Sequence, residues 1–206
     1  MADRLSLYNG ALLKLGQPRL VTLTDEGTAR RALDDCYAKV VKGCLEAGLW
    51  NFAMRFGEAT ASPSVSANYG FSHVFDKPDD WLRTAGVWED GNKRVPLLEY
   101  DDRASHWVAG RDTIYVQYVS NDDDYGMDLG LWPESFVEYV EFQLARNVCV
   151  DVTGSETKLD RLEKDAEKAR RIASNRDAMN EAVTRFPPPG RLMASRRSSR
   201  NSEHGR

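Results

Sequence analysis

The sequence predicts an α+β protein: a helical bundle formed by N- and C-terminal helices, a small antiparallel β-subdomain inserted in the middle, and a flexible C-terminal tail. Three observations predict it. Apolar residues recur at helical spacing before residue 50 and after residue 132. Short runs of β-branched and aromatic residues, separated by Gly, Pro, Asp and Asn, fill the region between. The Ser- and Arg-rich end lacks apolar residues to pack. The expected units are residues 1–50, 51–120, 121–184 and 185–206.

Composition limits the possible functions. A chain of 206 residues that is 41% apolar can bury one sizeable core. A net charge of −4 argues against the whole chain being a nucleic-acid-binding protein, although six arginines and one acid follow residue 184. No apolar run approaches the roughly 20 residues that span a bilayer, and no charged-then-apolar leader opens the sequence. We therefore expect no membrane partner, and a protein that stays in the compartment where it is made.

The cysteines indicate synthesis in a reducing compartment. Cys36, Cys44 and Cys149 form no Cys-x-x-Cys pair. Cys36 and Cys44 lie about 12 Å apart by helix rise, which is too far for a disulfide. All three fall at inner helix positions, where burial keeps a thiol inert.

Two helices are expected before residue 50. The first covers residues 2–15 and is ended by Gly16 and Pro18. Its apolar face consists of Leu5, Tyr8, Leu12 and Leu15. The second covers residues 26–47, with Thr24 and Asp25 as candidate N-caps and Gly48 at its end. Its inner stripe is Leu33, Tyr37 or Cys36, Val40 and Cys44.

The middle region predicts short strands at residues 74–75, 81–88, 94–98 and 113–119. Residues 113–119 are the strongest of these because β-branched and aromatic side chains dominate. Residues 88–93 resemble a tight hairpin, since Asp90-Gly91 can supply the positive φ angles that such a turn requires.

Two further helices are expected after the acidic loop at residues 121–130. Pro133 at the first helical position and Glu134 in the first turn open a largely buried helix that Gly154 ends. Ser155 caps the last helix, which runs to about residue 183. Its narrow apolar stripe is Leu159, Leu162, Ala166, Ala169 and Ala173.

No motif predicts catalysis, a metal or a cofactor. Residues 86–93 approach a phosphate-binding loop but lack the Lys-Ser/Thr pair and the following helix. Residues 121–132 approach a calcium loop, yet Trp132 stands where a bidentate Glu is needed, so we favour a solvated acidic loop. His73, His106 and His204 are too scattered for a metal pair. The absence of a recognisable nucleophile also makes a small hydrolase a weak alternative.

The acidic pairs of the sequence are expected to be solubilising surface. Asp34-Asp35 and Asp101-Asp102 are adjacent in sequence, so their side chains point apart and cannot share a proton as acid/base dyads do.

Several motifs resemble the tail tubular protein A family, the head-to-tail adaptors of short-tailed bacteriophages. The motifs are Ala11-Leu12-Leu13-Lys14-Leu15-Gly16, Leu23-Thr24-Asp25-Glu26, Ala29-Arg30 through Leu33 and Tyr37, Trp50-Asn51-Phe52-Ala53, and later the order of the strand at 114–118, the acidic loop, Trp132-Pro133, Phe136 and Leu144-Ala145. Their order and spacing carry the resemblance up to about residue 180. None of them is catalytic.

The resemblance implies a structural virion protein and not an enzyme. Twelve copies would form a ring beneath the portal, with a nozzle resembling tail tubular protein B on the far side and DNA passing through the channel without specific binding. The protein would be made in the host cytoplasm and reside in the virion tail. Trp50-Asn51-Phe52-Ala53 is interpreted as a structural motif at the crossing from the helices to the β-subdomain. The tryptophans could instead be interface anchors, although core packing is favoured.

The basic tail has three interpretations. We expect residues 186–206 to dock on an acidic portal surface. The portal-binding candidates are Phe186, Arg191, Leu192, Arg196, Arg197 and Arg200. A frayed terminus is the plain alternative. The alternative from another functional class is a DNA-binding module in which the arginines contact phosphate without sequence preference.

Overall fold

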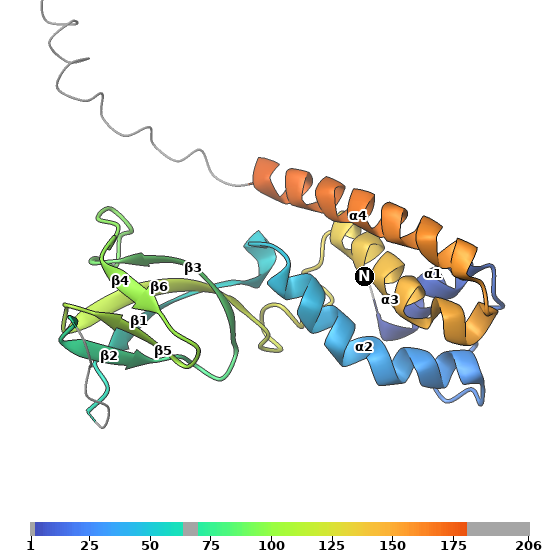
Figure 1. Cartoon of the computed structure of the whole chain (residues 1–206), viewed down its shortest axis with the longest axis horizontal. Coiled ribbons are helices and arrows are strands. Elements are labelled where there is room, and N and C mark those ends of the chain that lie inside the picture. The colour runs from blue at the N-terminus through green and yellow to red at the C-terminus, as the bar shows by residue number, and fades with distance from the viewer. Residues whose placement is uncertain (1–2, 64–69, 181–206) are drawn as a thin grey trace, which may run out of the picture.

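The computed structural model describes residues 3–63 and 70–180, which form two lobes. In order, the elements are α1 (Arg4–Leu15), α2 (Thr28–Glu46), a 3-10 turn (Asn51–Ala53), β1 (Met54–Thr60), β2 (His73–Asp76), β3 (Trp81–Trp88), β4 (Tyr100–Asp102), β5 (His106–Ala109), β6 (Thr113–Ser120), α3 (Glu134–Thr153) and α4 (Glu156–Met179). The helices gather in one lobe and the strands in the other (Figure 1), hereafter the helical lobe and the β lobe. The α+β prediction is confirmed.

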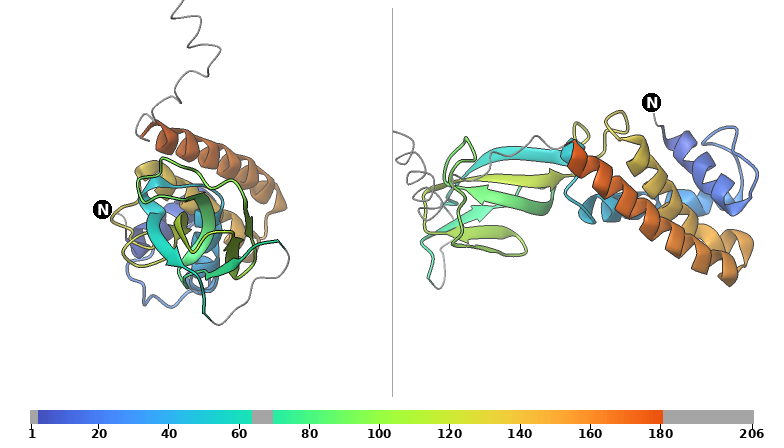
Figure 2. Two further views of the ribbon diagram at one scale, coloured as in Figure 1. Left: turned by 90° about the vertical axis from the view of Figure 1, so that its left-hand side faces the viewer. Right: turned by 90° about the horizontal axis from the view of Figure 1, so that it is seen from above.

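Helix α3 is the central element of the helical lobe. It contacts α1, α2 and α4, and its buried side chains include Phe136, Val140, Leu144 and Val148. Of the predicted apolar face of α1, Tyr8, Leu12 and Leu15 are buried. Leu5 is only half-buried, and Leu7, which was not predicted, is buried in the core. Helix α4 buries its predicted alanine stripe and Leu162, whereas Leu159 is half-buried. The remaining positions of α4 are mostly charged, as its position on the outside of the lobe in Figure 2 requires.

The helix boundaries correct two of the expected caps. Helix α2 begins after Gly27, not after Thr24 or Asp25, because the Asp25 carboxylate accepts hydrogen bonds from the backbone of Val21 and Thr22 and so holds the preceding turn. A hydrogen bond from the Thr22 hydroxyl and these two backbone bonds lower the pKa of Asp25. Pro133 is the N-cap of α3 and not its first helical residue. Gly16 and Ser155 take their predicted roles at the end of α1 and the start of α4.

The strands form two three-stranded antiparallel sheets within the described residues, in the orders β1-β6-β3 and β2-β5-β4. The predicted strands at 74–75, 81–88 and 113–119 are confirmed, while β1, β4 and β5 were not predicted. Between the sheets lies a second core. Its members include Phe75, Val87, Trp107, Ile114, Val116 and Tyr118.

The strand predicted at residues 94–98 is wrong. The segment forms an isolated bridge between Pro96 and Trp88 and no regular strand. The bridge is made by the Glu89 N–H, which donates to the Val95 carbonyl, and by the Leu97 N–H, which donates to the Val87 carbonyl, both at 2.9 Å. The turn before it is also not the predicted one: the positive φ falls on Lys93, and the Asp90 carboxylate accepts hydrogen bonds from the next two backbone N–H groups after Lys93, each 2.9 Å long. The chain does return alongside β3, but through a side-chain-braced loop.

The two lobes meet at Trp50. Its side chain is 1% exposed, its ring centroid lies 4.8 Å from that of Phe136, and its indole N–H donates to the Cys44 carbonyl at 2.9 Å. The backbone N–H of Asn51 donates to the Asp177 carboxylate at 3.0 Å, and the Asn51 amide donates to the Asp177 carbonyl at 2.9 Å. These contacts tie α2, α3 and α4 to the turn from which β1 begins. We call this set the junction.

Replacing Trp50 by Ala is expected to lower the free energy of unfolding by about 3–5 kcal/mol, because a large buried ring and a buried hydrogen bond are lost together. Chemical denaturation monitored by circular dichroism measures the loss. Leu49→Ala is the matched control, since Leu49 is 45% exposed and should change stability by less than about 1 kcal/mol. Equal effects of the two substitutions would show that Trp50 is not a core residue.

Candidate functional site

The possible metal ligands are the first candidates for a site. Among the described residues, no group of three or more His, Cys, Asp or Glu side chains is placed to hold a metal ion. In the acidic loop, the Asp122 and Asp128 carboxylates accept backbone N–H groups two residues further on, from Asp124 and Gly130, so they brace turns. No helix in the described part of the chain is both long and apolar enough to cross a membrane.

The cysteines are placed as structural residues. Cys44 and Cys149 are buried, and Cys36 is half-buried; all three are free thiols. Burial raises the pKa of Cys44 to about 12, which leaves it a neutral thiol at physiological pH. Burial likewise raises the pKa of Cys36.

One member of each acidic pair makes an ion pair that was not expected: Asp34 is half-buried, whereas Asp102 is exposed, as expected. Asp34 accepts hydrogen bonds from Arg4 at 2.8 Å and Tyr8 at 2.7 Å, and also pairs with Arg30, so it clamps α1 to α2. Asp102 pairs with Lys77, whose side chain is only 4% exposed. The cationic partners of these two carboxylates come from other parts of the fold or from the next helical turn, so the pairs themselves do not reveal them.

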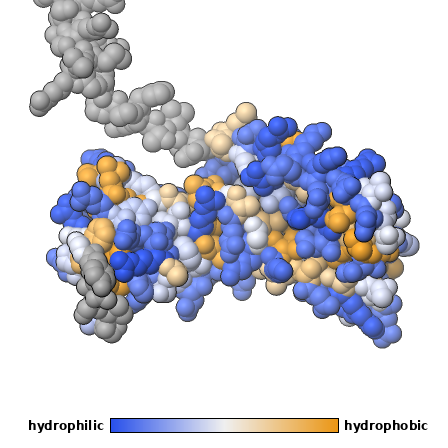
Figure 3. Space-filling view, viewed as in Figure 1, coloured by the Kyte–Doolittle hydropathy of each residue, from blue (hydrophilic) through white to orange (hydrophobic). Residues whose placement is uncertain are grey.

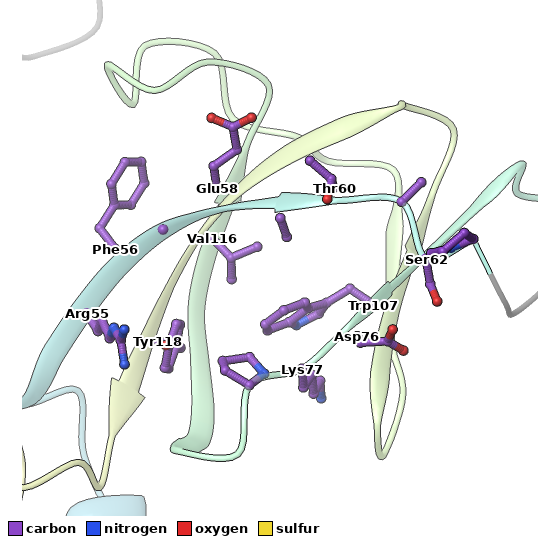
Figure 4. Close-up of a pocket in the computed structure, with 15 residues that line it drawn as sticks. Arg55, Phe56, Glu58, Thr60, Ser62, Asp76, Lys77, Trp107, Val116 and Tyr118 are labelled. Atoms are coloured by element: carbon purple, nitrogen blue, oxygen red, sulfur yellow. The ribbon is translucent and has the colours of Figure 1, made fainter.

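The β lobe contains a cleft of about 560 Å³ (Figure 4). One wall is β1 and the residues after it, and the other wall is the end of β2 with the segment that follows. The lining residues are Arg55, Phe56, Gly57, Glu58, Ala59, Thr60, Ala61, Ser62, Pro63, Asp76, Lys77, Pro78, Trp107, Val116 and Tyr118. We call it the β cleft. Its size falls in the range of small-ligand and peptide sites.

A polar network around Asp80 closes one end of the β cleft. The Asp80 carboxylate pairs with Arg55 at 2.9 Å and accepts hydrogen bonds from Tyr118 and Ser120. Burial alone would raise the pKa of Asp80, but the hydrogen bonds from Ser120 and Arg55 outweigh it and hold that pKa below its ordinary value. Burial and the neighbouring Asp80 charge raise the pKa of Tyr118 to about 12. Asp80 is thus a fixed carboxylate that positions Arg55.

A buried cation forms the facing wall. The Lys77 ammonium lies 3.5 Å from the centroid of the Trp81 ring and 5.5 Å from that of Trp107, a favourable cation–π arrangement. It also donates to the Arg103 carbonyl and to Asp102. Lys77 is therefore committed to the wall and is not free to bind an anion.

The second hollow, about 550 Å³ in volume, lies at the junction and is lined by the end of α4, the end of α2 and the outer face of the β1-β6-β3 sheet. Next to it, the Lys93 ammonium lies 4.5 Å from the Phe56 ring centroid and 5.5 Å from that of Trp88. Figure 3 shows apolar patches on both lobes in an otherwise largely hydrophilic surface. Among the described residues, the most exposed large apolar side chains are Val21, Leu98 and Met179, which belong to three different parts of the chain.

The predicted site residues fall into two groups. Trp50, Asn51, Phe52 and Ala53 lie at the junction, where Phe52 packs 4.8 Å from Phe136 and Ala53 is fully buried. The portal-binding candidates Phe186, Arg191, Leu192, Arg196, Arg197 and Arg200 lie outside the described residues. The β cleft was not predicted. The one hint in the sequence is Gly57 in the middle of β1, since an interior strand glycine often marks a close approach to its backbone.

In comparisons with known proteins, no family model and no curated protein matches this chain. The functional inference therefore depends on the residues and on their arrangement.

Replacing Asp80 by Asn should lower the free energy of unfolding by about 1–3 kcal/mol at neutral pH, because charge-assisted hydrogen bonds are weakened. Folding lowers the pKa of Asp80 from its ordinary value of 3.8. The ionised carboxylate therefore stabilises the fold fully above that pH, and this stabilisation is lost as the pH falls through the lowered pKa. The difference between wild type and variant should therefore shrink below about pH 4. Denaturation curves across this range measure it, with Asp79→Asn as an exposed neighbouring control. A difference that does not vary with pH would refute the role of the Asp80 charge.

Proposed function

We propose that this chain is a head-to-tail adaptor of a short-tailed bacteriophage virion, a ring-forming structural protein that connects the portal to the tail nozzle around the DNA channel. The observation that carries the proposal is the place of Trp50-Asn51-Phe52-Ala53. The same residues that resemble the adaptor family are those that join the helical lobe to the β lobe.

The packed junction supports a connecting role. A connector must hold two binding surfaces at a defined separation, and the contacts of Trp50 with α2 and α3 and of Asn51 with α4 fix the start of β1 against three helices. The described residues offer polar networks committed to structure, such as those of Asp34 and Asp80, and not a convergent set of reactive groups. That pattern favours an assembly protein over an enzyme.

The charge distribution favours protein partners over DNA. Residues 1–180 hold 22 of the 28 basic residues and 30 of the 32 acidic residues, so this part carries a formal charge of −8. Non-specific DNA binding needs phosphate neutralisation by clustered Lys and Arg, and an acidic body opposes it. The DNA-binding alternative thus rests on the six arginines after residue 184 alone. A gel shift that persists at moderate salt would favour it.

Mixing the purified full chain with its portal ring should give a complex that carries about one copy per portal subunit, because each portal subunit offers one equivalent site in a closed symmetric assembly. Size-exclusion chromatography with light scattering measures the mass. The isolated chain and the isolated portal are the controls. No association with an intact portal ring would overturn the adaptor proposal.

A further inference from the structure

We propose that the β cleft binds residues 191–197 of a second copy of this chain, which add an extended strand to the free edge of β1. The proposal concerns contacts between copies and does not depend on the adaptor role. It assigns Arg191, Leu192, Arg196 and Arg197 to a neighbouring subunit, whereas the sequence placed them on the portal.

The free edge of β1 follows from its pairing with β6. Ala61 donates its backbone N–H to the Asp112 carbonyl at 3.2 Å, on the β6 side, and antiparallel hydrogen-bonded pairs recur at every second residue. Arg55, Gly57 and Ala59 therefore bond to β6. The backbone groups of Phe56, Glu58 and Thr60 point away from it, toward the β cleft. An edge strand with such groups is a template for a further strand.

The end of β2 presents a second edge to the same cleft. Lys77 donates its backbone N–H to the Ser105 carbonyl at the end of the β2–β5 pairing, so the backbone groups of Val74 and Asp76 point the other way. The Ser62 N–H already donates to the Val74 carbonyl at 2.7 Å. The two sheets are thus joined at this point. Away from this point, toward Arg55, the two sheets separate, and the β cleft lies between them.

The cleft has an apolar floor with a gap above Gly57. Trp107, Val116 and Tyr118 lie beneath β1, while Phe56 and Glu58 point away from the floor (Figure 4). Gly57 is paired with Val116 and so belongs to the floor-facing side of β1. A Cβ built on Gly57 meets no atom within 4 Å. A side chain from an added strand can fill that space.

The rim of the cleft carries two carboxylates without a partner. Glu58 and Asp76 make no ion pair or side-chain hydrogen bond with any residue that the structure describes, whereas the cations Arg55 and Lys77 are neutralised by Asp80 and Asp102. The occupant should therefore be basic as well as extended.

Residues 191–197, Arg-Leu-Met-Ala-Ser-Arg-Arg, have that chemistry. Leu192 and Ala194 are two residues apart, so in an extended strand both face the floor, and the flanking arginines reach the rim. The segment matches the seven residues of β1 in length. The three prolines at 187–189 cannot donate to a ladder, so strand pairing can begin only after Gly190.

Charge complementarity supports donation between copies. Residues 1–180 carry a formal charge of −8, and six arginines follow residue 184. The end of α4 lies at the junction, where Asp177 and Ala178 line a hollow with Met54 at the start of β1 and with Arg83 of β3. Donation from copy to copy gives a head-to-tail interface, which closes into a ring when the subunit rotation fits.

The test uses two full-length variants. Gly57→Leu fills the cleft, and Leu192→Asp places a charge on the apolar floor. Wild type should self-associate as its concentration rises, and each variant alone should associate at least about tenfold more weakly, as when a central interface anchor is lost. An equimolar mixture should form a dimer, because the intact tail of the first variant can enter the intact cleft of the second. Sedimentation equilibrium measures the self-association of the wild type, of each variant alone and of the mixture.

Gly43→Leu is the matched control, because a Cβ at Gly43 also meets open space, on an exposed face of α2 far from the cleft. It should associate as wild type does, and circular dichroism should show that all variants fold. In associated wild type, the amides of Glu58 and Thr60 should become protected from hydrogen exchange. Wild type that stays monomeric at millimolar concentration, or a mixture of the variants that stays monomeric, would overturn the proposal.

Discussion

The fold depends on the burial of Trp50 against Phe136. The chain passes between the lobes twice, and both passages contact the ring of Phe136. On the way out, Trp50 and Phe52 each place a ring centroid 4.8 Å from that of Phe136. On the way back, Trp132 lies 4.9 Å from Phe136 and donates its indole N–H to the Gly126 carbonyl at 2.8 Å. Edge-to-face aromatic contacts of this kind fix orientation as well as adding buried area. The Asn51–Asp177 hydrogen bonds then hold α4 in the same unit.

The junction also fixes the start of β1. Because β1 begins directly after the Asn51–Ala53 turn, the helices set the position of its first residues, and the strand then pairs with β6 along its whole length. Its far end instead bonds to β2 through Ser62 and Val74. A strand fixed at both ends to different partners leaves an opening between them. Two backbone edges, an apolar floor and carboxylates that have no partner among the described residues meet in this opening, a combination that suits an extended peptide.

Local rules predicted much of the fold. Helical spacing and glycine stops gave α1, α3 and α4 within a few residues, and β-branched and aromatic runs gave β3 and β6. Strand β1 was missed because Gly57 and Glu58 have low β-propensity, and only pairing with β6, more than fifty residues away, makes the segment a strand. The predicted N-cap of α2 was wrong because the Asp25 side chain serves the preceding turn, and the start of α3 was misplaced by one residue. Apart from the hint given by Gly57, the β cleft could not be predicted, since it depends on the relative position of two sheet edges, which no local pattern encodes. The partners of Asp34 and Asp102 depend equally on tertiary contacts.

The proposed assembly role rests on a junction that fixes the lobes, on a cleft with two strand edges and on a basic terminus that follows an acidic body. An electron cryomicroscopy map of the full chain mixed with the portal ring tests that proposal most directly. It should show a closed ring coaxial with the portal, the two lobes oriented as in Figure 1, and density for residues 191–197 in the cleft of the adjacent subunit. Isolated subunits at irregular positions, or a ring whose clefts are empty while the termini lie on the portal, would contradict it.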